Sequence, residues 1–192
     1  MIAFRKPSAG RLRTFLDKQC QFGLSYPAVG ATAAVPPVGY VVDHTRVRLG
    51  EGARTFAAAK FALTRWEQFH LGWVELWPPD APIAKGESVV VMAWLFGLWR
   101  LNACRIVYVE DQEEPIVRFG FAYGTLPDHA ESGEERFTVE WHKDSGAVWY
   151  DILAYSRPQK FLTRLGYPLV RRLQKRFARD SAAAMQRAVV DV

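Results

Sequence analysis

The stretch FGFAYGTLPDHAESGEERF, residues 119–137, contains two candidate strands and the segment that connects them. Aromatic residues alternate with Gly and Ala over residues 119–124, and such alternation places successive side chains on opposite faces of a strand. A face of small residues lets another backbone or a ligand approach closely, while the aromatic face packs in a core or lines a cavity. The polar segment LPDHAESGE, residues 126–134, is typical of a turn or loop. Alternation resumes over residues 134–141, so we expect two strands joined by a loop rather than a phosphate cradle.

Before this pair of strands, the spacing of hydrophobic residues changes from that of a strand to that of a helix. Residues 41–49 alternate with polar partners, which predicts a strand. Residues 53–69 place apolar side chains at helical spacing without an interior Gly or Pro, which predicts an amphipathic helix. A short helix is expected around residues 12–16, and residues 25–39, with three prolines among them, are typical of a loop.

The rest of the chain has a strand-like pattern until its last segment. Residues 158–190 are helical in pattern, with Pro168 as an interruption, and Leu169, Leu173 and Phe177 share one side. This order of elements is typical of the α+β class: a strand, a helix, a run of antiparallel strands and a long final helix. Runs separated by turn residues predict six strands, at residues 73–77, 86–97, 98–111, 115–126, 134–144 and 146–156.

This order is that of the helix-grip fold, in which a curved antiparallel β-sheet is wrapped around a long C-terminal helix and a cavity lies between them. We expect a helix and loop extension over residues 1–39 and a helix-grip domain over residues 40–192, together forming a single globular unit.

Four long segments of the chain resemble one family. They are SYPAVGAT (25–32), LGEGARTFAAAK (49–60), GFAYGTLPDHAESGEERF (120–137) and YSRPQKFLTRLGYPLVRRLQKRFARDSAAAM (155–185). Together they closely resemble uncharacterised protein family 0548, a domain of unknown function in the helix-grip superfamily of START-related and birch-pollen-allergen-like domains. The resemblance implies the fold but no reaction and no site residues. The superfamily usually has two helices after the first strand; here one long helix is predicted, with the second replaced or moved to the N-terminal extension.

Composition favours a folded protein of a reducing compartment. Hydrophobic residues make up 49% of the 192 residues, which argues against disorder. Cys20 and Cys104 fit neither a metal-binding spacing nor a disulfide framework. The most apolar run, residues 88–99, is shorter than the roughly 20 residues that a membrane helix needs, and no signal peptide is recognised. We therefore expect a soluble, cytoplasmic protein without a transmembrane segment.

Two motifs suggest chemistry, and each has a simpler structural interpretation. The glycines of LGEGARTF, residues 49–56, lack the third glycine of a dinucleotide site and the Lys-Ser or Lys-Thr of a P-loop, so a tight turn is favoured. His129 with Glu134 and Glu135 could supply an acid and a base or metal ligands. The other histidines lie in unrelated segments. We therefore expect no metal, no cofactor and no catalytic residue, with His129 on the surface and Glu135 held by an arginine.

Two basic features leave alternatives open. Arg105 lies mid-strand among apolar residues, so it either pairs with an acid such as Glu135 or Asp151, or fixes the polar end of a ligand. Residues 160–187 contain eight Lys or Arg against one acid, within a net charge of +5. That segment could contact nucleic acid, an anionic membrane or an acidic partner, but it is also typical of the solvated side of an amphipathic helix. Nucleic acid is the disfavoured alternative because no known binding motif accompanies it.

The function we expect is the binding of a small hydrophobic molecule, lipid-like or polycyclic, between the sheet and the C-terminal helix. The alternatives are an enzyme of the same fold that uses Glu135 or His129 as proton carrier, and an interaction protein that uses the basic helix. No motif specifies the ligand or an oligomeric state. The expected ligand-binding residues are five aromatic wall residues and two polar anchors: Trp66, Trp94, Tyr123, Tyr150 and Phe177, with Arg105 and Glu135.

Overall fold

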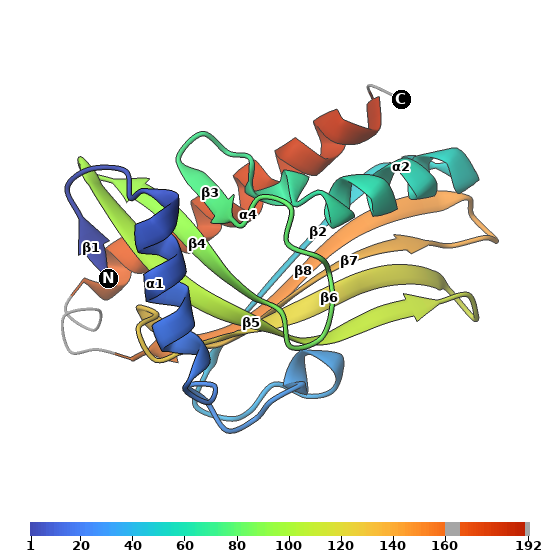
Figure 1. Ribbon diagram of the computed structural model, residues 1–192. Coiled ribbons are helices and arrows are strands. Elements are labelled where there is room, and N and C mark those ends of the chain that lie inside the picture. The colour runs from blue at the N-terminus through green and yellow to red at the C-terminus, as the bar shows by residue number, and fades with distance from the viewer. Residues whose placement is uncertain (160–165, 191–192) are drawn as a thin grey trace.

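The computed structural model describes residues 1–159 and 166–190 (Figure 1). The described strands are β1 (Ile2–Ala3), β2 (Val41–Glu51), β3 (Val74–Trp77), β4 (Ser88–Leu95), β5 (Leu98–Gln112), β6 (Val117–Thr125), β7 (Glu131–Trp141) and β8 (Ala147–Pro158). The described helices are α1 (Ala9–Cys20), α2 (Gly52–Thr64) and α4 (Tyr167–Val190), with short 3-10 turns η1 (Ala31–Ala33) and η2 (Glu67–Phe69).

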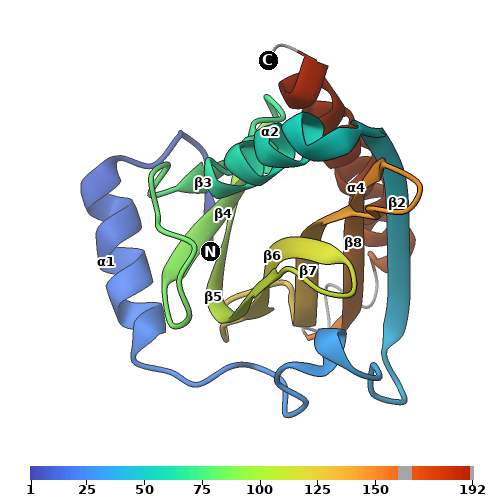
Figure 2. The ribbon, with the colours of Figure 1, turned by 90° about the vertical axis from the view of Figure 1, so that its right-hand side faces the viewer.

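The strands form one antiparallel sheet in the order β2-β8-β7-β6-β5-β4-β3, with β1 beside β5. The sheet curls strongly, and α2 and α4 lie across its concave side (Figure 2). Helix α1 lies outside the curl, where it contacts β4. The predicted α+β class, a curved antiparallel sheet with a long C-terminal helix, is therefore confirmed.

The strand boundaries differ from the prediction at the start of β7. This strand begins at Glu131, so the loop after β6 is shorter than the polar composition of residues 126–134 suggests. Gly133 lies within the strand, where a Cβ atom would be 1.9 Å from the carbonyl oxygen of Tyr155. A glycine that looks like a turn residue therefore serves the close approach of β8.

The helix predicted over residues 53–69 ends earlier, at Thr64. Trp66 has a left-handed backbone conformation, with a φ of 59°, and the chain then makes the 3-10 turn η2. This turn follows α2 where the superfamily usually has a second helix. Gly52 has a φ of 80°, which agrees with a strand-to-helix turn rather than a phosphate site. Residues 160–165 of the predicted C-terminal helix lie outside the described residues.

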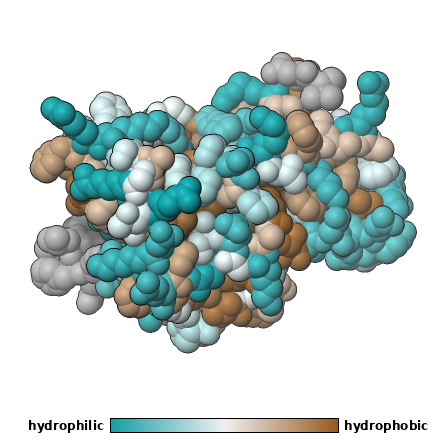
Figure 3. Space-filling model, viewed as in Figure 1, coloured by the Kyte–Doolittle hydropathy of each residue, from teal (hydrophilic) through white to brown (hydrophobic). Residues whose placement is uncertain are grey.

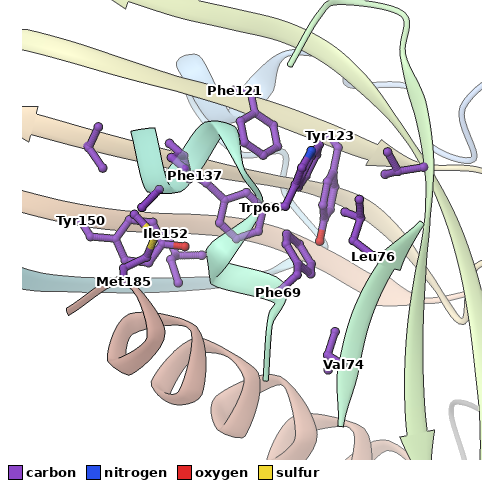
Figure 4. Packing of buried hydrophobic residues seen from close by; sticks show 14 of the residues in the cluster. Trp66, Phe69, Val74, Leu76, Phe121, Tyr123, Phe137, Tyr150, Ile152 and Met185 are labelled. Atoms are coloured by element: carbon purple, nitrogen blue, oxygen red, sulfur yellow. The ribbon is translucent and has the colours of Figure 1, made fainter. Parts of the chain in front are cut away.

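Two clusters of apolar side chains pack on the two faces of the sheet. On the concave side, the rings of Trp66, Phe69, Phe121 and Phe137 gather between the strands and α4 (Figure 4). The Trp66 and Phe121 ring centroids are 4.8 Å apart in an edge-to-face arrangement, which is a favourable geometry for aromatic pairs. The smaller cluster lies between α1 and the outer face of β4 and β5: Leu12, Phe15, Leu16, Val90, Met92, Leu101, Ala103 and Leu126.

The two halves of α4 are buried to different extents. Ser181, Ala182, Ala184 and Met185 are buried in its second half. In its first half Leu169 is exposed, so this half is less buried than the predicted apolar side of Leu169, Leu173 and Phe177 implied.

Hydrophilic and hydrophobic residues are interspersed over the face of the molecule seen in Figure 3. None of the described helices combines the length and apolar character needed to cross a lipid bilayer.

Candidate functional site

A cavity of about 840 Å³ lies between the concave face of the sheet and α4. One group of its polar residues lies where β6 ends and β7 begins, beneath the first half of α4, and includes Thr125, His129, Glu131, Glu135 and Gln174. Further polar and charged lining residues come from β2, β5, β8 and α4: Asp43, His44, Thr45, Arg100, Asn102, Ser156, Lys175, Arg179 and Gln186. The remaining wall is mostly apolar and comes from β2, β3, β4, β8, η2 and α4: Val47, Phe69, Val74, Val91, Ala93, Leu95, Ile152, Ala154, Leu173, Phe177, Ala178 and Ala182.

Three of the predicted ligand-binding residues, Tyr123, Glu135 and Phe177, line this cavity. Phe177 lies over Phe69, with ring centroids 5.3 Å apart, so helix and η2 share one aromatic wall. Tyr123 and Glu135 are directly opposite each other on β6 and β7. The inward-facing Tyr123 of β6 and Glu135 of β7 therefore belong to the cavity, whereas Phe121 and Phe137 of the same strands pack in the core.

The other predicted aromatic residues lie elsewhere. Trp66 is fully buried in the dry core, where its indole N–H donates a 2.7 Å hydrogen bond to the carbonyl of Ala81. Tyr150 is also fully buried, and its hydroxyl is 2.9 Å from that of Ser181 on α4. Trp94 is half exposed near the end of β4. None of these three residues is part of the cavity lining.

Arg105 also lies away from the cavity and contacts neither of the acids predicted as partners. Its guanidinium donates to the carbonyl of Cys20 at 2.8 Å, to the carbonyl of Phe22 at 3.3 Å and to the Ser88 hydroxyl at 3.2 Å. These carbonyls lie at and just beyond the end of α1, where a cation complements the helix dipole. Arg105 therefore holds α1 against the sheet.

Glu135 is a carboxyl group inside the cavity without an arginine partner in the described chain. Its Oε2 atom accepts a 2.8 Å hydrogen bond from the hydroxyl of Tyr123. Burial raises the pKa of Glu135 to about 7, and the nearby carboxylates of Asp43 and Glu131 act in the same direction, against the hydrogen bond from Tyr123. The side chain retains some accessible surface because it faces the cavity. Among the described residues, the hydrogen-bond partner of Glu135 is therefore Tyr123 and not an arginine, and Arg105, the first expected partner, contacts other groups.

His129 and Glu135 line the same cavity, which contradicts the prediction that His129 lies apart on the surface. The imidazole Nδ1 of His129 accepts a 3.0 Å hydrogen bond from the backbone N–H of Glu131. The reason is that β7 begins early, at Glu131. The loop after β6 is therefore short, and His129 stays close to the strand ends that border the cavity. The polar composition of the loop is thus compatible with a cavity wall.

Glu131 is the second carboxyl group of this polar end, and only 6% of its surface is exposed. Its Oε2 atom accepts hydrogen bonds from the hydroxyl of Ser156, at 2.8 Å, and from the amide of Gln174. Its Oε1 atom is buried and has no hydrogen-bond partner within residues 1–159 and 166–190. Burial raises the pKa of Glu131, although Ser156 and Arg171 oppose this shift.

Glu134 points to the opposite face and has a structural role that the sequence did not reveal. Its carboxylate accepts hydrogen bonds from the hydroxyl of Tyr26 at 2.6 Å, from the backbone N–H of Gly30 at 2.7 Å and from that of Thr32 at 3.0 Å. The ring of Tyr26 lies on Gly124, where a Cβ atom would be 2.1 Å from the Tyr26 hydroxyl. The small residues of β6 therefore admit the N-terminal loop. The close approach of another backbone or a ligand was expected at this face; the group that approaches Gly124 is instead the side chain of Tyr26.

A network of charges covers the same outer face around Asp151. Its carboxylate contacts Arg136 at 3.1 Å, Arg46 at 3.2 Å and His44 at 2.6 Å. Burial alone would raise the pKa of Asp151, but the hydrogen bonds and charges of His44 and Arg136 lower it overall. Asp151 therefore has Arg136 as its partner instead of Arg105.

Several basic residues of α4 are engaged within the molecule. Arg171 binds Asp43 of β2 through its guanidinium, and Arg176 and Arg179 contact Asp180 at 3.3 and 3.0 Å. Arg176 also lies over the ring of Trp73, 4.3 Å from its centroid. Arg171 thus joins α4 to the sheet, whereas the ion pairs of Arg176 and Arg179 lie within the helix. In the described part of the chain, no three His, Cys, Asp or Glu side chains converge as a metal site requires.

The family model described as "Domain of unknown function (DUF1990)" matches residues 25–184. The chain belongs to this family. A UPF0548 protein of Dictyostelium discoideum is 36% identical over 207 residues, which cover 98% of this chain and 96% of that protein. The UPF0548 protein At2g17695 of Arabidopsis thaliana is 34% identical over 154 residues, 79% of this chain and 74% of that protein. The resemblance to uncharacterised protein family 0548 is confirmed.

Solved structures show that the DUF1990 chain has the helix-grip fold. Ara h 8.0201, which has the fold of the birch-pollen allergen, superposes with a TM-score of 0.50 and 10% identity, covering 80% of this chain and all of its own. The hypothetical protein jhp0584 of Helicobacter pylori gives a TM-score of 0.53 at 12% identity, with coverage of 85% and 94%. At these identities the similarity concerns the fold alone.

Proposed function

We propose that this protein encloses a small, mostly hydrophobic molecule, lipid-like or polycyclic, in the cavity between the sheet and α4. The observation that carries the proposal is the cavity itself. Its volume of about 840 Å³ lies within the roughly 300–1,000 Å³ typical of ligand pockets. Most of the accessible surface of its wall is apolar, with polar groups set among the apolar side chains, which is the usual composition of a small-molecule site.

A substitution that fills the cavity tests the proposal. Ala154 lines the cavity on β8, between Glu135 of β7 and Asp43 of β2 in the strand register. Ala154→Trp places an indole in the space, while Leu153→Trp adds one at the neighbouring position, whose side chain points to the other face. Nile red, a neutral polycyclic dye, is titrated into each folded protein and its fluorescence is recorded.

Saturable binding is expected for the native protein and for Leu153→Trp, with binding at least about tenfold weaker for Ala154→Trp, because an indole that fills the space removes the contacts of the dye. Equal binding by all three proteins would place the dye outside the cavity and count against the proposal. Thermal unfolding of each variant shows whether it is folded before the dye is added.

Proton transfer to or from a bound hydrophobic substrate is a second candidate function. It is favoured by the pKa of about 7 of Glu135, because a general base or acid works best near the ambient pH. Glu135→Gln keeps the shape of the side chain but cannot carry a proton. Molecules extracted from the purified protein are incubated with the native protein and with this variant, and mass spectrometry follows their conversion. Conversion by the native protein alone supports catalysis, and conversion by neither counts against it.

A further inference from the structure

We infer that the cavity selects hydrophobic molecules that carry a basic nitrogen, with the ammonium group held at the polar end by Glu135 and Glu131. This inference rests on the proposed function and names the class of ligand. A hydrophobic amine has two parts that match two parts of the cavity. Its apolar body fits the wall of Phe69, Phe177 and Leu173, and its cation fits the carboxyl groups.

The first carboxyl group is already oriented toward a ligand. Tyr123 donates to Oε2 of Glu135, which fixes the plane of the carboxyl group. Its Oε1 atom accepts no hydrogen bond from any residue in the described ranges. Across the register Glu135 is opposite Ala154, whose methyl group leaves the space beside the carboxyl open. An N–H donor in the cavity can reach that oxygen.

The second carboxyl group provides independent support. Glu131 is more than nine-tenths buried, lines the same cavity and has an Oε1 atom without a hydrogen-bond partner in the described part of the chain. A buried carboxylate oxygen that stays unpaired is costly, so a donor that reaches it stabilises the complex. A bound ammonium group has three N–H donors and can donate to an unpaired carboxylate oxygen.

The charges around these groups favour a cation over an anion. Asp43 of β2 and Glu135 of β7 are both opposite Ala154 in the strand register, and Glu131 precedes Glu135 by four residues in β7, so carboxyl groups predominate around Glu135. Arg171, the cation that α4 brings nearby, is bound to Asp43.

Among the described residues, the other basic groups of the cavity wall form no ion pair with Glu135: Arg100, Lys175 and Arg179, with His44, which contacts Asp151, and His129. Arg100 is directed to Asn102 and to the carbonyl of Asp128, at 3.4 Å each. Lys175 and Arg179 are exposed along the helix. A fatty acid or another anionic amphiphile would bring a further negative charge to Glu135, whereas an ammonium group would neutralise one.

The test uses three probes of nearly the same shape: 2-(1-naphthyl)ethylamine, 2-(1-naphthyl)ethanol and 1-naphthaleneacetate. Isothermal titration calorimetry measures their affinities for the native protein and for Glu135→Gln at pH 8. We expect the native protein to bind the amine about ten- to hundredfold more tightly than the alcohol, since a hydrogen bond to a charged partner is worth that much. The acetate should bind most weakly. In Glu135→Gln the advantage of the amine should fall to less than about threefold.

The pH dependence provides a second readout. Because the pKa of Glu135 is about 7, its ionised fraction falls from about 0.9 at pH 8 to about 0.1 at pH 6, and the amine affinity should fall roughly tenfold. An aliphatic amine, with a pKa of about 10, stays charged throughout this range. The alcohol affinity should stay the same within about twofold. If the fall persists in Glu135→Gln, another group such as His129 causes it, and the inference is wrong.

The outcomes separate the two proposals. If the alcohol binds as tightly as the amine and Nile red also binds, the cavity is a hydrophobic site without a preference for nitrogen, and only the inference fails. If Nile red and all three probes fail to bind, the proposed function and the inference fail together. Binding of the alcohol by Glu135→Gln serves as the control that the variant is folded.

Discussion

Glu134 and Glu135 are adjacent in β7, yet their carboxyl groups lie on opposite faces of the sheet and have opposite surroundings. Glu134 is surrounded by donors from the N-terminal loop, namely Tyr26, Gly30 and Thr32. Glu135 faces the cavity, where Tyr123 is its hydrogen-bond donor among the described residues. One carboxyl group is therefore satisfied by the fold, and the other is available to a ligand.

The raised pKa of Glu135 makes stability depend on pH. A carboxyl group whose folded pKa, about 7, exceeds the ordinary value of 4.5 binds its proton more tightly in the folded state. Stability is therefore lost as the pH rises from 4.5 to 7. Glu135→Gln should be about 1–3 kcal/mol more stable than the native protein at pH 8, and most of this difference should be lost at pH 5. Urea denaturation at both pH values measures this difference.

The exposed Glu113→Gln is the control for this measurement, because a solvated carboxyl group should produce no such difference. Equal stabilities of the native protein and Glu135→Gln at pH 8 would show that the Glu135 carboxylate is well solvated in the cavity.

The contact between Tyr26 and Gly124 predicts a strong effect of a single methyl group. In Gly124→Ala the new Cβ atom would be 2.1 Å from the Tyr26 hydroxyl and 2.7 Å from its ring. The ring must move and lose its hydrogen bond to Glu134, so we expect a loss of about 1–3 kcal/mol in chemical denaturation. Gly10→Ala, in a helix with open space around it, should be neutral or slightly stabilising.

A double-mutant cycle shows whether this contact is the cause. In a Tyr26→Ala background the obstacle is gone, and Gly124→Ala should cost at least about 1 kcal/mol less than in the native background. The same cost in both backgrounds would place the clash elsewhere.

The burial of α4 predicts a gradient of effects along the helix. Met185 is fully buried, so Met185→Ala should lower the free energy of unfolding by about 2–5 kcal/mol. Leu173 borders the cavity and is only partly buried, so Leu173→Ala should cost about 1 kcal/mol. Leu169, which is 43% exposed, is the control, and its replacement by Ala should stay within about 0.5 kcal/mol. Equal losses at Leu173 and Met185 would show that no open space lies beside Leu173.

The order of strands and helices was predictable because it follows from local patterns. Residues 119–124 and 134–141 alternate with period two, and the final helix has an amphipathic pattern, so neither requires knowledge of distant contacts. The start of β7 was not predictable, because Gly133 is in the strand to admit the carbonyl of Tyr155 rather than to make a turn. Composition does not distinguish these two uses of glycine.

The cavity residues were harder to predict for a physical reason. Tyr123 and Glu135 line the cavity. Tyr150 also points to the concave side of the sheet, but α4 covers it, and its hydroxyl contacts that of Ser181. An inward position on a strand is a local property, but whether it meets a side chain or open space depends on where α4 crosses the sheet. The partners of Arg105 were equally hard to predict, because the carbonyl groups that it binds at the end of α1 are more than eighty residues away in the chain.

The central claim is that the concave side of this sheet holds an apolar ligand, and methyl NMR during a titration with Nile red tests it most directly. We expect shifts in the methyl signals of Val91, Ile152 and Leu173, which line the cavity, and none in those of Val42 and Val109, which are exposed. These shifts should saturate at one dye per protein and be absent in Ala154→Trp. Shifts confined to exposed residues, with the cavity methyl groups unchanged, would contradict the account.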